Sequence, residues 1–200
     1  MRRVAGILLA AGSSRRFGSN KLLAPLADGT PLAAAAARQL NAAVPEAVAV
    51  LRPGDAELAA VLAAQGLRIV ECAQAEYGMG HSLAAGVAAA GTADAWLIAL
   101  ADMPAIKDST LAVLVAQLAA GSALVAPFHN GQRGHPVGFA SGLRTELLSL
   151  TGDTGAREIL VRHAPSLTRL DVDDPGILID VDTPRDLRRA TAPRPDSATS

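Results

Sequence analysis

The sequence predicts an α/β fold in which helices cover both faces of one doubly wound, mainly parallel sheet. Three observations support this prediction. Apolar runs of strand length alternate with Ala- and Leu-rich runs of helical length, and the connections between them are short. Half of the 200 residues are hydrophobic, but only 2% are aromatic. A core of this composition must be built from Ala, Leu and Val side chains packed closely between helices and strands.

The first half of the chain is expected to alternate regularly between strands and helices. Strands are predicted over residues 4–10, 47–51, 67–70 and 95–100, and helices over residues 31–43, 55–65 and 80–90. The helix ends carry the matching signals. Thr30-Pro31 is typical of an N-cap followed by the first helical residue, and Gly66 and Gly91 are typical helix stops.

The second half continues this alternation and then becomes less regular. A helix capped by Asp108 or Ser109 and ending at Ala120 precedes a strand over 123–128, and Asn130-Gly131 is a turn signal. Further strands are predicted over 136–140, 167–172 and 177–181, helices over 143–150 and 156–162, and a last short helix from Thr183-Pro184. Residues 191–200 are expected to form a disordered tail after a single domain over 1–190.

The charge balance and cysteine content exclude several classes of protein. Lys and Arg number 18 and Asp and Glu 19, so neither nucleic acid nor a membrane surface is expected as a ligand. No apolar stretch is long enough to form a membrane-spanning helix. Cys72 is the only cysteine, which excludes an internal disulfide and a multi-cysteine metal site and fits a cytoplasmic protein. The alternative, a secretory signal, is disfavoured because the apolar run after Arg3 is short.

The segment after the first predicted strand is the clearest sign of a ligand. It reads Leu9-Ala10-Ala11-Gly12-Ser13-Ser14-Arg15-Arg16-Phe17-Gly18-Ser19-Asn20-Lys21. Backbone N–H groups around Gly12 can approach a polyphosphate while Arg15, Arg16 and Lys21 supply positive charge, so we expect a triphosphate. The segment has neither the Gly-Lys-Ser/Thr of a Walker loop nor the Gly-x-Gly-x-x-Gly of a dinucleotide site. The alternative is a basic loop that only faces solvent.

Carboxylates at the ends of later strands are candidate metal ligands. Asp102 follows the strand predicted over 95–100, and because parallel strands end at the same edge of a sheet, it is expected beside the basic loop. Asp180 and Asp182 alternate at another strand end, so one of them can point to the same place. Mg²⁺ takes one or two carboxylates together with phosphate oxygens. Alternatively, Asp102 only forms a turn, and Asp182 or Thr183 is a helix N-cap.

Further segments are candidate walls of the site. The small residues Gly78, Gly80 and Ser82 surround the start of a predicted helix, where a base or ribose can approach the backbone. The alternative there is an ordinary loop with Ser82 as a helix cap. Residues of the less regular part, where a second substrate can enter, are His135, Asp153 and Arg157. His135 is explained equally well as a structural histidine.

Taken in order, these segments resemble the nucleotidyltransferases of molybdenum cofactor maturation, the MobA-like NTP transferases, and specifically their cytidylyltransferase branch. The family pattern comprises Leu-Ala-Ala-Gly-x-Ser-x-Arg-x-Gly-x-x-Lys, Gly-Met-Gly-x-Ser, Asp-Met-Pro, Gly-His-Pro, Gly-Asp-x-Gly-Ala-Arg and Asp-x-Asp-Thr-Pro. All of these occur between Leu9 and Pro184, so the resemblance covers nearly the whole chain. Each motif alone is weak, whereas the ordered set is specific. One departure is Phe17, where relatives often carry Met.

The resemblance implies a Rossmann-like fold of the nucleotide-diphospho-sugar transferase type and transfer of CMP from CTP to the phosphate of molybdopterin. The products would be molybdopterin cytosine dinucleotide and pyrophosphate. It also implies Mg²⁺ as the cofactor, with Mn²⁺ as an alternative ion, and transient contact with a molybdoenzyme or its maturation chaperone. Relatives that transfer guanylyl groups more often begin the loop with Ala-Gly-Gly, so Ala10-Ala11-Gly12 favours cytidine.

Carried over to this sequence, the resemblance assigns roles to named positions. The catalytic residues would be Arg15, Lys21 and Asp102, and the metal would be held by Asp102 with Asp180 or Asp182. The acceptor would be bound by His135, Asp153 and Arg157. The residues that bind the nucleotide would be Ala10, Ala11, Gly12, Arg15, Lys21, Gly78, Gly80 and Ser82. Because the nucleophile is itself a phosphate anion, the reaction needs alignment and charge neutralisation rather than a covalent catalyst.

The sequence leaves other functions open. A protein of the same fold can use GTP, or activate a different phosphorylated acceptor such as a sugar phosphate. A non-catalytic carrier of the pterin would keep the fold but have no need of Lys21 or the paired carboxylates. A nicotinamide-dependent oxidoreductase fits the fold class but would require the glycine fingerprint that this chain lacks.

Overall fold

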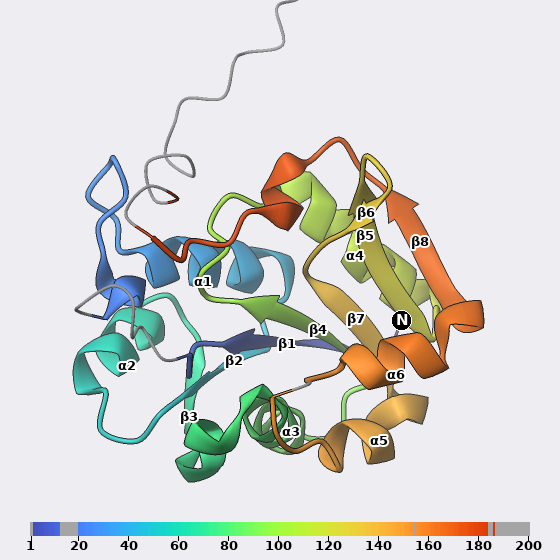
Figure 1. Cartoon of the computed structure of the whole chain (residues 1–200), viewed down its shortest axis with the longest axis horizontal. Helices are drawn as coiled ribbons and strands as arrows, with labels where there is room; N and C mark the ends of the chain where they lie inside the picture. The colour runs from blue at the N-terminus through green and yellow to red at the C-terminus, as the bar shows by residue number, and fades with distance from the viewer. Residues whose placement is uncertain (1, 13–19, 154, 184–185, 187–200) are drawn as a thin grey trace, which may run out of the picture.

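The computed structural model describes residues 2–12, 20–153, 155–183 and 186, and its strands there form one mixed sheet (Figure 1). The strands are β1 (Val4–Leu9), β2 (Ala47–Leu51), β3 (Arg68–Glu71), β4 (Ala95–Leu100), β5 (Leu124–His129), β6 (Gln132–Arg133), β7 (Val137–Ala140) and β8 (Leu167–Asp171). They lie in the order β3-β2-β1-β4-β7-β5-β6, and β8 pairs with β5. β3, β2, β1 and β4 are parallel neighbours, as are β5 and β8, whereas β7 and β6 run antiparallel to their neighbours.

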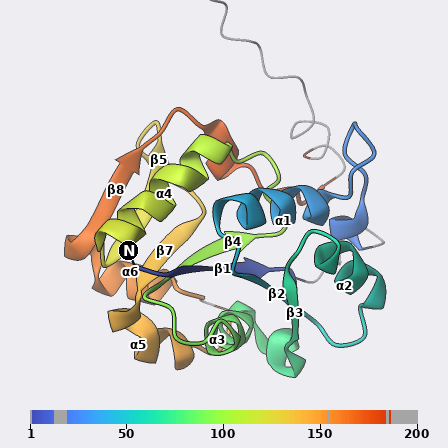
Figure 2. The same ribbon diagram turned by 180° about the vertical axis from the view of Figure 1, so that it is seen from behind.

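Helices cover both faces of this sheet, as the sequence predicted (Figure 2). One face carries α1 (Leu32–Ala43), α2 (Ala56–Ala63) and α4 (Asp108–Ala120), and the other carries α3 (Met79–Ala89), α5 (Arg144–Leu148) and α6 (Arg157–Arg162). Short 3-10 helices are η1 (Lys21–Leu23), η2 (Ala73–Tyr77), η3 (Ser141–Leu143), η4 (Ala164–Ser166) and η5 (Pro175–Leu178). The α/β, doubly wound and mainly parallel fold class is therefore confirmed.

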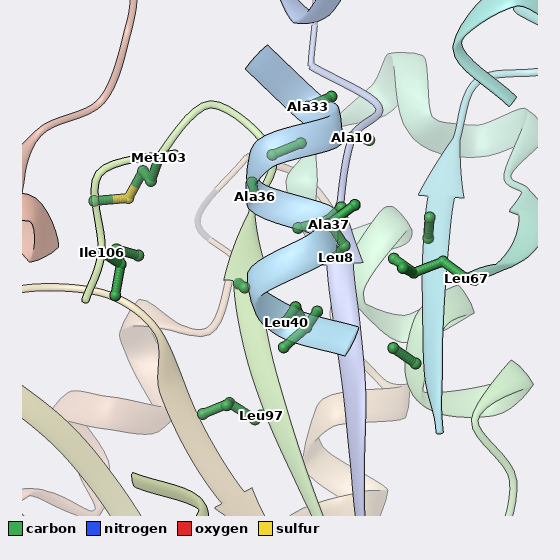
Figure 3. Packing of buried hydrophobic residues seen from close by; sticks show 14 of the residues in the cluster. Leu8, Ala10, Ala33, Ala36, Ala37, Leu40, Leu67, Leu97, Met103 and Ile106 are labelled. Atoms are coloured by element: carbon green, nitrogen blue, oxygen red, sulfur yellow. The ribbon is translucent and has the colours of Figure 1, made fainter. Parts of the chain in front are cut away.

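The core is built mainly of aliphatic side chains, as the low aromatic content predicted, and Trp96 and Phe139 are buried on the face that α3 covers. Figure 3 shows α1 lying against the sheet, and Ala33, Ala36 and Ala37 of this helix belong to the same buried cluster as Leu8. Methyl side chains let the helix approach the sheet closely, so the buried surface is packed densely without large rings. The whole run Ala33–Ala37 is at most 6% exposed. Within the described ranges, no helix has the length and apolarity that crossing a bilayer requires.

The expected strand over residues 177–181 is wrong. Residues 175–178 instead form η5, because Pro175-Gly176 follows Asp174 in a capped turn. The segment then crosses the end of the sheet: the Ile177 carbonyl accepts a hydrogen bond from the His135 backbone N–H at 3.0 Å, and the Val181 backbone N–H donates to the Asp102 carbonyl at 2.9 Å. These bonds take the place of a strand ladder, and we call residues 172–182 the C-terminal strap.

Several helix boundaries differ from the prediction by a residue or more. The first helix begins at Leu32, with Pro31 rather than Thr30 in the N-cap position. The helix predicted over 143–150 is divided into η3 and the shorter α5. The Asn130-Gly131 turn is confirmed, because both residues have positive φ (50° and 80°) and join β5 to β6. Pro184 and the predicted tail over residues 191–200 lie outside the described residues.

The start of α4 is stabilised from a distant part of the chain rather than by its own cap. Neither Asp108 nor Ser109 is the N-cap; Lys107 holds that position without a side-chain cap bond. The fully buried Asp174 accepts hydrogen bonds from the Lys107 backbone N–H and the Thr110 hydroxyl, both at 2.7 Å. Its other oxygen accepts from the Gly176 N–H at 3.0 Å. Asp174 thus fixes the C-terminal strap to α4.

We expect Asp174→Ala to lower the free energy of unfolding by about 2–4 kcal/mol, because it leaves buried donors on both α4 and the strap without acceptors. Urea unfolding followed by circular dichroism measures the loss. Asp173→Ala is the matched control: that side chain is 97% exposed, so its truncation should change stability by no more than about 0.5 kcal/mol. Equal stability of the two variants would show that Asp174 does not anchor the strap.

Candidate active site

A cavity of about 340 Å³ opens at the carboxyl ends of the parallel strands. Its wall includes eight residues that the sequence placed in the site: Ala10, Ala11, Gly12, Lys21, Gly78, Ser82, Asp102 and Asp153. The size falls within the range of ordinary small-molecule pockets. The position also agrees with the rule for doubly wound sheets, since the strand order reverses direction between β1 and β4.

Adjacent parallel strands bring the early loop and Asp102 together. Leu9 at the end of β1 pairs with Leu100 at the end of β4. The next residues stay in register, because the Ala101 N–H donates to the Leu9 carbonyl at 3.1 Å. The chain therefore leaves both strands at one point, with Gly12 on one side and Asp102 on the other. This confirms the inference that the two segments share an edge of the sheet.

Lys21 is directed into the site by a rigid turn. Asn20 caps η1 by accepting a hydrogen bond from the Leu22 N–H at 3.1 Å, and its amide donates to the Asp55 carboxylate at 2.7 Å. The same Asp55 caps α2 through the Leu58 N–H. Because η1 is tied in this way to α2, Lys21 is held in place and is only 8% exposed.

The ammonium of Lys21 lies between two carboxylates. Its Nζ donates to Asp102 Oδ2 at 3.0 Å and to Asp182 Oδ1 at 2.7 Å. Burial alone would lower the pKa of Lys21, but hydrogen bonding to Asp182 and the charge of Asp102 outweigh it, so the pKa lies above its ordinary value. Lys21 is therefore a permanently charged group at neutral pH.

The structure distinguishes between the two late carboxylates. Both are exposed, but Asp182, on the C-terminal strap, accepts a hydrogen bond from Lys21, and Asp180 is near enough to His135 to influence its charge. Asp102 and Asp182 are therefore the two carboxylates that meet at the site.

This donor set fits a divalent cation. Asp102 Oδ1 is buried without a hydrogen-bond partner among the described residues, so one hard oxygen ligand is uncommitted. No group of three metal-ligating side chains occurs in the described part of the chain. Two carboxylates without a third side chain are typical of Mg²⁺ sites that are completed by phosphate oxygens and water.

Gly78 lines the first cavity, whereas Gly80 lies behind its wall. Gly78 has φ of 129°, and a Cβ there would lie 2.2 Å from the Gly152 carbonyl carbon. The Gly80 N–H donates to the Gly152 carbonyl at 2.8 Å, and Gly80 does not line the cavity, so its predicted contact with the nucleotide is not supported. The two glycines instead bring the loop that carries Asp153 against α3.

A second cavity of about 130 Å³ adjoins the first and shares Leu9, Met79 and Leu100 with it. Its wall is mainly apolar but includes Arg133, His135 and Arg157. Two of the three predicted acceptor residues, His135 and Arg157, therefore lie together, while Asp153 lines the first cavity.

His135 is neutral at pH 7. Burial and the nearby Arg133 guanidinium lower its pKa, and the carboxylates of Asp102 and Asp180 oppose this only in part. Its Nδ1 is buried without a hydrogen-bond partner among the described residues. A neutral imidazole with one uncommitted nitrogen can donate to or accept from a ligand, depending on its tautomer.

Sequence reasoning missed Arg52 and Glu76, which also line the first cavity. Arg52 follows directly after β2, and its Nε donates to the Ala11 carbonyl at 2.8 Å. The signal was available, because the strand-end argument that selected Asp102 applies equally to Arg52. Arg15 lies outside the described residues, so its predicted role stays a prediction.

Two characterised proteins are similar over almost the full length of the chain. Nicotine blue oxidoreductase of Paenarthrobacter nicotinovorans is 34% identical over 195 residues, which cover 93% of this chain and 95% of that protein. The purine catabolism protein PucB of Bacillus subtilis is also 34% identical, over 198 residues that cover 92% of this chain and 96% of that protein.

Solved structures show the same architecture. Rv0371c of Mycobacterium tuberculosis superposes with a TM-score of 0.82 at 28% identity, over 95% of this chain and 97% of that one. A second crystal structure of Rv0371c is a complex with manganese (TM-score 0.77, 25% identity, 94% of this chain and 98% of that chain covered). A putative glucose-1-phosphate thymidylyltransferase from Bacillus anthracis, at 15% identity and a TM-score of 0.75, shares the fold alone. The nucleotide-diphospho-sugar transferase-like fold is thus confirmed.

A match to a family model shows to which family the chain belongs. Residues 6–167 match the model described as the MobA-like NTP transferase domain. That range contains the early loop, Lys21, Asp102 and every lining residue of the second cavity. With the sheet order, the cavity and the paired carboxylates already in place, the chain belongs to the MobA-like NTP transferase family.

Proposed function

We propose that this protein is a Mg²⁺-dependent cytidylyltransferase that transfers CMP from CTP to the phosphate of molybdopterin. The products are molybdopterin cytosine dinucleotide and pyrophosphate. The observation that carries the proposal is the meeting of Lys21, Asp102 and Asp182 beside a cavity of nucleotide size. The choice of cytidine and of molybdopterin depends on the ordered sequence motifs, above all on Ala10-Ala11-Gly12.

The first cavity supports binding of a nucleoside triphosphate. Apart from its chain neighbours, no atom of the described residues lies within 4 Å of the side-chain position of Gly12, which would let phosphate oxygens approach the backbone. Lys21 and Arg52 add two positive charges to the same wall. Asp102 and Asp182 would hold Mg²⁺, which when bound supplies further charge neutralisation and orients the triphosphate.

The proposed reaction is an in-line substitution at phosphorus. An oxygen of the acceptor phosphate forms a bond to the α-phosphorus of CTP, the bond from that phosphorus to the bridging oxygen breaks, and the electron pair leaves with pyrophosphate. The two anions repel by about 1 kcal/mol per unit pair at 4 Å in water, and several-fold more in a crevice of low dielectric constant. Lys21 offsets this repulsion, so the protein needs no covalent nucleophile.

The second cavity supports the position of the acceptor. It adjoins the nucleotide cavity along Leu9, Met79 and Leu100, so a ligand there would lie next to the triphosphate. Arg133 and Arg157 supply positive charge for a phosphate, and the apolar wall suits a ring system. We therefore assign acceptor binding to His135 and Arg157, with Asp153 at the nucleotide side.

We also propose that the activity resides in one domain over residues 1–190, with residues 191–200 as a tail, and that the protein works in the cytoplasm. The buried, unpaired thiol of Cys72 fits a reducing compartment. The dinucleotide product of the protein would pass to a molybdoenzyme or a maturation chaperone through a transient contact.

A panel of nucleoside triphosphates tests the choice of nucleotide. In the presence of Mg²⁺, CTP at a hundred times its dissociation constant should raise the free energy of unfolding by about 2.7 kcal/mol. GTP, ATP and UTP at the same concentration should raise it less. Thermal unfolding measures the shifts. A larger shift with GTP would replace CTP by GTP in the proposal, and equal shifts for all four bases would remove the cytidine assignment.

Mass spectrometry of the product tests the acceptor. Protein incubated with molybdopterin, Mg²⁺ and a mixture of CTP and GTP should yield the cytosine dinucleotide together with pyrophosphate. Pyrophosphate only at background level would favour a non-catalytic pterin carrier. Product formed with a sugar phosphate in place of molybdopterin would identify a different acceptor.

One observation favours a second candidate function. The relative named nicotine blue oxidoreductase is 34% identical to this chain, which keeps a reductase activity under consideration. The early loop nevertheless lacks the glycine fingerprint of a dinucleotide site. Consumption of NADH or NADPH with an oxidised dye, without pyrophosphate release from any triphosphate, would support the oxidoreductase and contradict the transferase.

A further inference from the structure

The contacts of Lys21 bear on the order in which metal and nucleotide bind. The ammonium contacts Asp102 Oδ2 and Asp182 Oδ1, which are oxygens of the same two carboxylates that would hold the cation. Both oxygens lie within hydrogen-bond distance of one nitrogen, so the carboxylates are already drawn together around a positive charge. An ammonium and a divalent cation cannot occupy this position at once, because like charges at such separation repel.

We propose that the Lys21 ammonium takes the place of the divalent cation in the nucleotide-free protein, so that the metal enters together with the nucleotide. This inference rests on the proposed nucleotide site. When a triphosphate binds, its oxygens offer the ammonium a new partner, and Asp102 and Asp182 become available to the metal that the triphosphate carries.

The structure allows this exchange with little movement of the backbone. Asn20 and Asp55 fix the turn that carries Lys21, so only the long, flexible lysine side chain needs to move. The Val181 N–H holds the C-terminal strap to the Asp102 carbonyl at 2.9 Å, which keeps the two carboxylates in place. Asp102 Oδ1, buried without a partner among the described residues, adds a second ligand oxygen once the ammonium has left Oδ2.

The chain offers a matched control for this lysine. Lys21 and Lys107 are its two lysines. Lys107 also pairs with a carboxylate, but at 3.9 Å and with Asp173 97% exposed, so it is an ordinary surface pair. Removing the Lys107 charge therefore tests the general effect of losing a positive charge, whereas removing the Lys21 charge tests its competition with the metal.

The experiment is a Mn²⁺ titration followed by electron paramagnetic resonance, with and without CTP. Without nucleotide, Lys21→Met should bind Mn²⁺ at least tenfold more tightly than the unmodified protein, because the carboxylates keep their charges and lose the ammonium. Lys107→Met should match the unmodified protein. Saturating CTP should tighten Mn²⁺ binding to the unmodified protein by at least tenfold and to Lys21→Met by much less.

Two results would overturn the inference. One is an unchanged or weaker Mn²⁺ affinity of Lys21→Met without nucleotide; the other is a gain that persists in Lys21→Met/Asp102→Asn, which would place the ion elsewhere. If Lys21→Met does not fold, Lys21→Gln, which keeps a polar donor, gives the same comparison. A protein that binds no triphosphate would contradict the proposed function through the thermal shifts, while the nucleotide-free titration would still decide whether Lys21 excludes the metal.

Discussion

Lys21→Met is expected to lower the rate of CTP-dependent pyrophosphate release by about a hundredfold or more. The side chain is nearly buried and places its charge at the edge of the nucleotide cavity, where charge develops on the phosphates during transfer. Methionine keeps a long, unbranched side chain and removes only the ammonium. The loss should appear in kcat as well as in kcat/KM, because the interaction strengthens as pyrophosphate departs.

The controls separate catalysis from folding. Thermal unfolding should show a folded Lys21→Met variant, and Lys107→Met should retain its activity, because that lysine pairs only with the strap at the surface. Unchanged turnover of a folded Lys21→Met variant would remove Lys21 from the mechanism. Lys21→Met should therefore tighten Mn²⁺ binding in the titration without nucleotide and at the same time abolish most of the activity.

The central sheet could be predicted because its signals are local. β1, β2 and β4 are continuous apolar runs that are buried on both faces, and helices separate them, two of which are followed by the glycines Gly66 and Gly91. Once the strands were known to be parallel, their ends had to meet at one edge. Gly12 and Asp102 were therefore placed correctly from two short segments that lie far apart in the chain.

The C-terminal strap could not be predicted because its structure is determined by distant partners. The alternation around Ile179 resembles a strand, yet the backbone groups there bond to His135 and Asp102 rather than to a neighbouring strand. The anchor, Asp174, bonds to groups on α4 that are more than sixty residues away in sequence. Asp180 and Asp182 are two residues apart and would share one face of a strand, so the sequence pattern does not show which of them approaches the site.

Asp102→Asn is expected to lower turnover by about a hundredfold or more and to weaken Mn²⁺ binding in the presence of CTP. Asparagine has nearly the same shape but lacks the negative charge, and only one of its terminal atoms can accept from Lys21 or ligate a metal. Asp102 accepts one hydrogen bond from Lys21, so the variant should fold and keep the bond from Lys21 to Asp182. Pyrophosphate release and the Mn²⁺ titration measure the two effects.

The same substitution at Asp180 tests whether this loss is specific. Asp182 is the late carboxylate that accepts a hydrogen bond from Lys21, so Asp180→Asn should keep most of its activity, whereas Asp182→Asn should lose activity in the same direction as Asp102→Asn. If Asp180→Asn were the more damaging of the two, the second metal ligand would be Asp180, and the strap would have to turn when the nucleotide binds. Retained turnover in folded Asp102→Asn would contradict any role of this edge of the sheet in holding the metal, because Asp102 supplies the buried oxygen on which that role depends.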